Sequence, residues 1–391
     1  MSLLVMLGFG LIIPALPLLA TKFDVKEAGA GLVLTAFSVT RLMGDLFAGG
    51  LIDRFGERVV TAIGVAVVGV SSIAAGAAQS YVQLVVLRGL GGFGSAFFLG
   101  GLLAYLIGTI PEDSRGRAMG VFQAAIGIGI LIGPLVGGII IAVSSENIPL
   151  YVYGAVCLAS IPIALRALGG ERIPSDALTR APSVDENVPG PAEHTWKRMR
   201  PLFAISTYRA ALAVSGLVFL ITSALQTVIP LFWVGDLGLS KGTTGIPFMV
   251  TALAALVVVW HAGALSDRRG RKFALVPALA VMAVATALLG FTMSAVVVVA
   301  LMGVHGAASG YMRPGPTAMV ADVAPPDARG VAVSGYRIAG DVGSLLGPIM
   351  AGALAEFVSL RAAFLALAAI AMIVFVMAAR AEETAPSRRT A

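Results

Sequence analysis

Long apolar stretches, separated by short segments rich in charge, Gly and Pro, constrain this chain more than any other feature. A membrane-spanning helix needs about 20 mostly apolar residues, and 391 residues leave room for twelve such stretches. Their expected ranges are 2–20, 29–50, 60–78, 82–107, 116–143, 149–168, 207–234, 244–264, 274–293, 296–321, 329–356 and 360–379. Because 58% of the residues are hydrophobic and 12% charged, a water-soluble fold could not bury the apolar surface. We therefore expect an all-α membrane protein with twelve transmembrane helices.

A polar stretch divides the chain into two halves. Residues 169–202 are rich in Pro, Ser and charge and have no apolar period, which indicates a flexible cytoplasmic linker. We expect one six-helix half over 1–168 and a second over 203–391. Most of the 27 Lys and Arg residues lie in one alternating set of loops, whereas the opposite set holds Lys22, Lys26, Lys241 and Arg361. This asymmetry predicts a multi-pass protein of a bacterial inner membrane with both termini in the cytoplasm.

Several classes of function are excluded by what the sequence contains. The net charge of +6 does not indicate nucleic-acid binding, because the basic residues lie in short loops where they orient helices. No Gly-rich phosphate loop ending in Gly-Lys-Ser/Thr is present. The three histidines are scattered, and Cys157 lies within an apolar stretch, so we expect neither a metal site nor a nucleophile with its base. The chain is therefore not expected to be an enzyme or to need a cofactor; we expect a monomer.

The sequence repeats itself at one fixed offset. The segment GGLIDRFGER at 49–58 is echoed by GALSDRRGRK at 263–272, 214 residues later. At the same offset PEDSRGRAMG (111–120) matches PPDARGVAVS (325–334), and GPLVGG (133–138) matches GPIMAG (347–352). Because six helices separate the copies, both halves have the same membrane topology, as in parallel pseudo-repeats related by an axis along the membrane normal.

These repeated segments resemble the signatures of the major facilitator superfamily, specifically its twelve-helix drug:proton antiporter branch, and the resemblance covers essentially the whole chain. The signature between the second and third helices is carried by Gly49, Asp53, Arg54, Gly56 and Arg58, and its second copy by Asp267, Arg268, Gly270 and Lys272. Glu57 stands where the family usually has a basic residue. The resemblance implies that Asp–Arg pairing in these cytoplasmic loops latches one conformation; the alternative is an ordinary positive-inside loop.

The fifth helix resembles the antiporter signature at Gly133, Pro134, Gly137 and Gly138. Small residues let helices pack closely and proline bends a helix, a combination that suits a hinge or a leak-proof interface. The spacing of small residues by itself occurs in many membrane helices without such a role. Because the resemblance is to an antiporter signature, it favours export.

Charged and titratable residues inside the apolar stretches are candidates for proton coupling. They are Arg41, Asp45, Arg88, His305, Arg337 and Asp341. Arg88 occupies the position of the intramembrane arginine that the family associates with proton coupling; the alternative is a side chain that snorkels to the outer interface. His305 could carry a proton near neutral pH or could be a packing residue. The first apolar stretch lacks the acidic residue that several proton-coupled drug exporters carry there.

Two of these candidate sets are mirrored pairs. Arg41 with Asp45, and Arg337 with Asp341, lie four residues apart and so share a helix face. In the fold that the sequence resembles, the second and eleventh helices face one another. We hypothesise a four-charge cluster that exchanges partners; the alternative is two independent local salt bridges.

In the resembled family, helices 1, 4, 7 and 10 line a central cavity. Candidates for substrate contact on these helices are Phe97, Phe98, Tyr105, Gln226, Trp233, Tyr311 and Arg313. They suit a broad, mostly apolar pocket with few polar anchors, although an individual aromatic residue more often packs or faces lipid. We expect proton-coupled export of lipophilic or drug-like molecules by alternating access. The alternative is an importer, a narrow-specificity exporter or a facilitator of a metabolite such as a sugar or organic acid.

Overall fold

The computed structural model describes residues 1–110, 112–167, 200–325 and 328–384. Within these ranges, twelve helical segments are long and apolar enough to cross a membrane. The predicted class, an all-α protein with twelve spans, is confirmed. The linker expected over 169–202 lies outside the described residues except for its last three positions.

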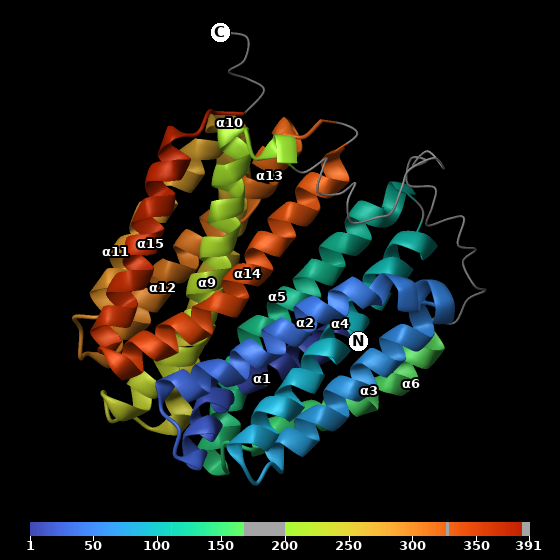
Figure 1. The fold of residues 1–391 in the computed structure, drawn as a ribbon, viewed down its shortest axis with the longest axis vertical. Coiled ribbons are helices and arrows are strands. Elements are labelled where there is room, and N and C mark those ends of the chain that lie inside the picture. The colour runs from blue at the N-terminus through green and yellow to red at the C-terminus, as the bar shows by residue number, and fades with distance from the viewer. Residues whose placement is uncertain (111, 168–199, 326–327, 385–391) are drawn as a thin grey trace. The chain divides into compact units, whose positions relative to one another are not determined.

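The helices follow the apolar stretches closely, and Figure 1 shows their arrangement within the chain. The first six are α1 (Ser2–Ala20), α2 (Glu27–Phe55), α3 (Glu57–Gly76), α4 (Tyr81–Thr109), α5 (Glu112–Val143) and α6 (Ile148–Ala167). The later ones are α9 (Ser206–Gly235), α10 (Gly245–Arg269), α11 (Arg271–Leu289), α12 (Ala295–Met312), α13 (Pro314–Val323), α14 (Arg329–Phe357) and α15 (Leu360–Arg380). Short 3-10 helices follow α1 and precede α10, namely η1 (Thr21–Phe23) and η2 (Lys241–Thr243).

Both copies of the Asp-Arg signature lie on helix ends instead of in loops. α2 continues to Phe55 and α10 to Arg269, so the predicted ends at 50 and 264 were too early. The last turns of both helices are polar, and they continue each helix beyond its apolar stretch. Hydropathy detects only the apolar part, so it places the helix end too early. A single glycine then separates each helix from the next, and Gly56 and Gly270 have φ of +82° and +106°. Glycine reaches these values without the steric cost that a Cβ would add.

The tenth apolar stretch forms two helices, not the single one expected over 296–321. α12 ends at Met312 and α13 starts at Pro314, with Arg313 at the junction. Proline lacks a backbone N–H and clashes with the preceding turn inside a helix, but it fits the first position of a new one. The break therefore follows from Pro314.

The described chain forms two compact units. The first comprises residues 1–167 and 233–249, and the second comprises 200–232 and 250–384. In the first unit α1 is buried over most of its length and packs on α5, while α3 lies beside α4 and α6 (Figure 1). In the second unit α11 packs against α12 and α15. Large apolar side chains such as Trp260, 84% exposed, lie outside these cores and suit contact with lipid.

Candidate functional site

The glycines of the α5 signature serve two different contacts. A Cβ on Gly133 would lie 2.5 Å from the Cα of Gly10 in α1, and one on Gly137 would overlap the backbone of Leu11. Real Cβ atoms do not approach so closely, so these positions require glycine. Gly133 and Gly137 therefore hold a close crossing of α1 and α5 inside the first unit.

The other face of the signature contacts the hairpin between α9 and α10. A Cβ on Gly138 would lie 2.5 Å from the carbonyl oxygen of Gly242, and one on Gly245 would overlap the carbonyl oxygen of Pro134. We call these four residues, Pro134, Gly138, Gly242 and Gly245, the outer seam. Because the three glycines of this seam have no side chains, the two backbones lie close together and leave little space between them.

A buried carboxylate lies near the end of the outer seam. The Oε2 atom of Glu146 is 2.6 Å from the Nζ atom of Lys22, and its Oε1 atom is 2.5 Å from the Nζ atom of Lys241. The Glu146 side chain is 7% exposed, whereas the two lysines are 42% and 51% exposed. This Glu146 cluster joins η1, the loop between α5 and α6, and η2.

The charges of the cluster keep Glu146 ionised. Burial raises the pKa of this carboxyl group, but the hydrogen bonds from Lys22 and Lys241 outweigh burial and lower the pKa from 4.5 to about 2. Glu146 was not among the residues predicted from sequence. The signal that could have found the cluster is the scarcity of basic residues in the loops predicted to face outward, because two of those four residues converge on Glu146.

Arg88 of α4 is buried inside the first unit. Its side chain is 2% exposed, and its guanidinium carbon lies 4.7 Å from the centre of the Phe37 ring. Within the described residues, Nε and Nη1 have no hydrogen-bond partner. The guanidinium therefore does not snorkel to an interface. Burying a charged group without hydrogen-bond partners costs free energy in a membrane protein, so such residues are usually retained for function.

The second unit carries a comparable residue in α12. His305 is 2% exposed, and its Nδ1 atom has no hydrogen-bond partner in the part of the chain that the structure describes. At the repeat offset, position 305 corresponds to Gly91, three residues after Arg88. Each unit thus has a buried, incompletely paired nitrogen at a similar level of its fourth helix.

The remaining proton-coupling candidates are less buried. Arg41 and Asp45 are half-buried, and the Nε atom of Arg41 is buried without a partner among the described residues. In α14 Arg337 is exposed and Asp341 half-buried, and among the described ion pairs these two do not bind each other. The hypothesis of a four-charge cluster stays a prediction.

The first copy of the Asp-Arg signature is exposed. Asp53, Arg54 and Arg58 all lie on the surface, and no ion pair of Asp53 occurs within the described residues. A Cβ on Gly49 would meet no described atom within 4 Å, so no described helix packs closely against this glycine. In the second copy Arg268 is exposed, and the side chain of Asp267 lies outside the described residues.

A hollow of about 490 Å³ lies between α2 and α4 in the first unit. It is lined by Phe47, Gly50, Leu51, Arg54, Phe93 and Phe97. The rings of Phe93 and Phe97 are 6.5 Å apart and tilted. Of the substrate-contact candidates, Phe97 is the one found in this hollow. Its neighbour Phe98 is 1% exposed and does not line it.

The other substrate-contact candidates have varied surroundings. Trp233 is buried, and its indole N–H donates a hydrogen bond of 2.8 Å to the hydroxyl of Thr243. The rings of Tyr311 and His261 meet edge to face at 6.0 Å. Tyr105 and Gln226 are half-buried, and Arg313 is exposed at the helix break. Contact of these residues with a substrate stays a prediction.

Twelve candidate spans in two compact units indicate a polytopic membrane protein. The chain belongs to the Major Facilitator Superfamily, whose family model matches residues 1–303 and 211–391. This superfamily consists of transporters of small molecules and not of enzymes.

Two curated relatives are similar over part of the chain. Multidrug resistance protein 1 of Bacillus subtilis (strain 168) is 30% identical over 162 residues, which cover 41% of each protein. Quinolone resistance protein NorA of Staphylococcus aureus (strain MRSA252) is 28% identical over 153 residues, 39% of each. The matched stretch thus spans about two fifths of these relatives.

Solved structures share the fold over nearly the whole chain. A bacterial homologue of the human lysosomal transporter Spinster superposes with a TM-score of 0.77 at 16% identity, covering 96% of this chain and 94% of that one. A mutant of the nucleoside transporter NupG gives 0.76 at 15% identity, covering 97% and 98%. At such identity the likeness concerns the fold.

Proposed function

We propose that this transporter exports small lipophilic or drug-like molecules in exchange for protons. The observation that carries the proposal is the 28–30% identity to multidrug and quinolone resistance proteins over about two fifths of the chain. The antiporter-like signature of α5 supports it, because its Pro134 and Gly138 form a tight seam with the hairpin between α9 and α10.

The outer seam suits the role of a seal in alternating access. Backbone atoms of Pro134, Gly138, Gly242 and Gly245 leave no room for side chains, and the Glu146 cluster ties the adjoining segments together. Release of a substrate to the outside then requires Lys241 and η2 to leave α5. The exposed Asp53 and Arg54 are accessible to partners in another conformation, which is the behaviour expected of a latch.

In this proposal, the proton coupling depends on the buried side chains of Arg88 and His305. The His305 ring is neutral with one N–H and positively charged when it takes up a second proton. A charge in a buried apolar site costs free energy. Uptake of a proton at His305 would therefore favour a conformation that admits water or a counter-ion. Arg88 supplies a fixed buried charge in the other unit, so its unpaired nitrogens would respond to the same rearrangement.

The hollow between α2 and α4 is the candidate contact for substrate. Its aromatic and aliphatic lining suits flat apolar molecules. One observation favours the alternative, a carrier for a metabolite such as an organic acid: Arg54 is the charged lining residue, and none of the six is acidic.

The test is accumulation of a panel of lipophilic fluorescent cations, neutral dyes and anions in a pump-deficient bacterial host that expresses the chain. Lower accumulation of cations or neutral dyes, abolished by a protonophore, supports proton-driven export of drug-like molecules. Export confined to anions supports the alternative. Unchanged accumulation of every compound, with expression confirmed in the membrane, would contradict drug export.

A further inference from the structure

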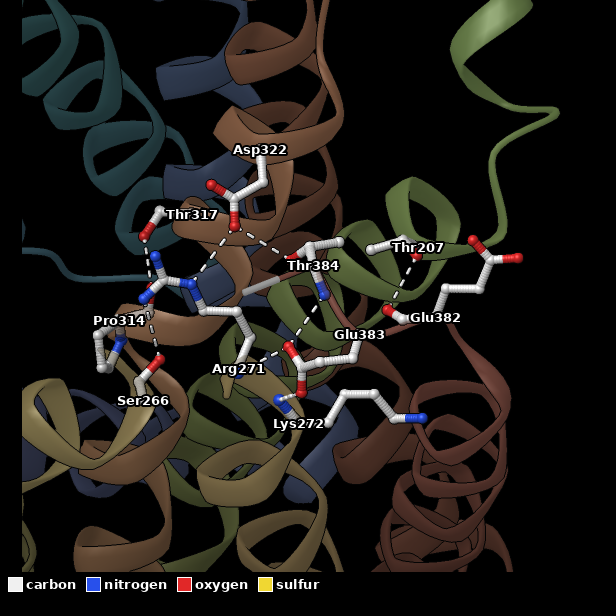
Figure 2. A network of polar contacts seen from close by, with 10 residues as sticks. All are labelled: Thr207, Ser266, Arg271, Lys272, Pro314, Thr317, Asp322, Glu382, Glu383 and Thr384. Carbon is white, nitrogen blue, oxygen red and sulfur yellow. Dashed lines mark hydrogen bonds and ion pairs between the residues drawn. The ribbon is translucent and has the colours of Figure 1, made fainter. Parts of the chain in front are cut away.

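The last described residues of the chain lie against the second copy of the Asp-Arg signature. Figure 2 shows Glu383 and Thr384 beside Arg271, Lys272 and Asp322. The carboxylate of Glu383 accepts hydrogen bonds from the backbone N–H groups of Arg271 and Lys272, at 2.9 and 3.0 Å. These are the first two residues of α11, so Glu383 occupies the position of a helix cap supplied from more than a hundred residues away.

Further bonds tie the same segment down. Lys272 Nζ donates to the carbonyl oxygens of Ala379 and Ala381, at 2.7 and 2.6 Å, and so binds the end of α15. The hydroxyl of Thr384 donates to Asp322 at 3.1 Å. Arg271 Nε reaches the same carboxylate of Asp322 at 3.4 Å. The bonds of Lys272, Glu383 and Thr384 thus link α11, α13 and α15 of the second unit.

The sequence explains why α11 needs a cap from elsewhere. Its first two residues, Arg271 and Lys272, are basic, and its first turn has no acidic residue. Positive charge at a helix N-terminus opposes the helix dipole, and Glu383 supplies the missing negative charge. Gly270 also fits this arrangement, since a Cβ there would lie 2.6 Å from Oε2 of Glu383.

The first copy of the signature lacks the residues that make this arrangement. At the repeat offset Arg271 corresponds to Glu57, which puts an acidic residue in the first turn of α3 itself. Asp322 corresponds to Gly108 and Glu383 to Gly169, neither of which has a carboxylate. The two copies are alike in their Asp, Arg and Gly pattern but differ at the positions that hold the tail.

We propose that residues 382–384 form a strap that fixes the second signature copy as a static brace, so that the first copy is the one that changes partners during transport. This proposal rests on the alternating access proposed above. It predicts that the α10–α11 junction keeps its structure through the cycle, because Glu383 neutralises and caps the start of α11. Loss of the strap should then slow the conformational change without altering the affinity for substrate.

The experiment compares Glu383→Ala with Glu382→Ala in the full-length purified protein. The neighbour is a matched control, because its backbone carbonyl accepts a hydrogen bond from Thr207 while its exposed side chain makes none of the strap bonds. Hydrogen exchange read by mass spectrometry should show the amides of Arg271 and Lys272 exchanging about tenfold faster in Glu383→Ala, the loss expected for one helix cap. Glu383→Gln, which keeps one acceptor oxygen, should be intermediate and serves if the alanine variant fails to fold.

Transport measurements then separate the strap from the proposed function. With an exported compound, Glu383→Ala should lower the maximal rate several-fold at unchanged KM, whereas Glu382→Ala should match the wild type. Unchanged exchange in Glu383→Ala, or equal effects of both substitutions, would overturn the strap. Faster amide hydrogen exchange with an unchanged maximal transport rate would overturn the role of the strap in transport. If the wild type exports nothing, the proposed function fails while the exchange result still decides whether the strap exists.

Discussion

At the scale of single residues, Glu146 shows how a charge can be buried at the end of a membrane helix. Two lysines from distant segments compensate the loss of water, and their hydrogen bonds keep the carboxylate charged. Arg88 and His305 have no comparable compensation at the nitrogens that lack partners among the described residues. We therefore propose that Glu146 acts in structure and sealing, and that Arg88 and His305 act in proton coupling.

The first prediction concerns Glu146→Gln. The pKa shift from 4.5 to about 2 corresponds to roughly 3 kcal/mol, and screening of the half-exposed lysines reduces this to about 1–2 kcal/mol. The melting temperature in detergent at pH 7 should therefore fall by a few degrees. Because the folded pKa is the lower one, this stability is present above about pH 4.5 and is lost as pH falls toward 2.

The pH dependence provides the control for that measurement. The wild type should lose its advantage over Glu146→Gln between about pH 4.5 and pH 2, where the carboxyl group takes up a proton. If the difference in melting temperature is absent at pH 7, or is unchanged near pH 2, the cluster does not contribute as described.

At the scale of elements, the α5 signature shows how glycine positions divide their contacts. Gly133 and Gly137 face α1, while Gly138 faces η2 and the start of α10. The sequence pattern does not distinguish the two faces. The packing partners show that the first face contacts α1 and the second contacts η2 and the start of α10.

Gly138→Ala should impair transport through the outer seam. Its Cβ would lie 2.5 Å from the carbonyl oxygen of Gly242, so the seam must open to admit it. Gly127→Ala in the same helix is the matched control, because a Cβ there meets no described atom within 4 Å. We expect at least a several-fold loss of export rate in Gly138→Ala at normal membrane levels. Equal rates in both variants would remove the seam from the mechanism.

Asp53→Asn tests the first signature copy. The side chain is exposed and has no ion pair with a described residue, so its replacement should leave membrane insertion and melting temperature unchanged. If Asp53 is a latch in another conformation, the export rate should nevertheless drop by roughly tenfold, as for loss of a charge-assisted hydrogen bond. Export at the wild-type rate would argue that this charged helix end merely orients the helices in the membrane.

Helices could be predicted from sequence well, but their junctions could not. Hydropathy located all twelve spans because lipid requires continuous apolar helices. It missed the polar last turn of α2 up to Phe55, and it missed the break at Pro314 within an otherwise apolar stretch. Signature motifs identified Gly138, whereas Glu146 and Glu383 escaped because their partners lie far away in the chain and no local pattern marks them.

At the scale of the whole molecule, two repeated halves have diverged in ways that suit different tasks. The first carries Arg88, an exposed signature copy at the α2–α3 junction and the α5 seam. The second carries His305 and a signature copy at the α10–α11 junction that residues 383 and 384 hold. Such asymmetry is compatible with a shared fold, because the packing glycines recur at Gly133 and Gly347 while Arg88, His305 and Glu383 have no charged or titratable counterpart at the repeat offset.

The central claim, export driven by proton exchange, is tested most directly in proteoliposomes containing the purified protein. An imposed pH gradient should drive a lipophilic substrate against its own gradient, and adding the substrate should in turn move protons. We expect Arg88→Ala to lose gradient-driven accumulation while still inserting into the membrane. Equilibration of the substrate without accumulation, or accumulation indifferent to the pH gradient, would contradict the account.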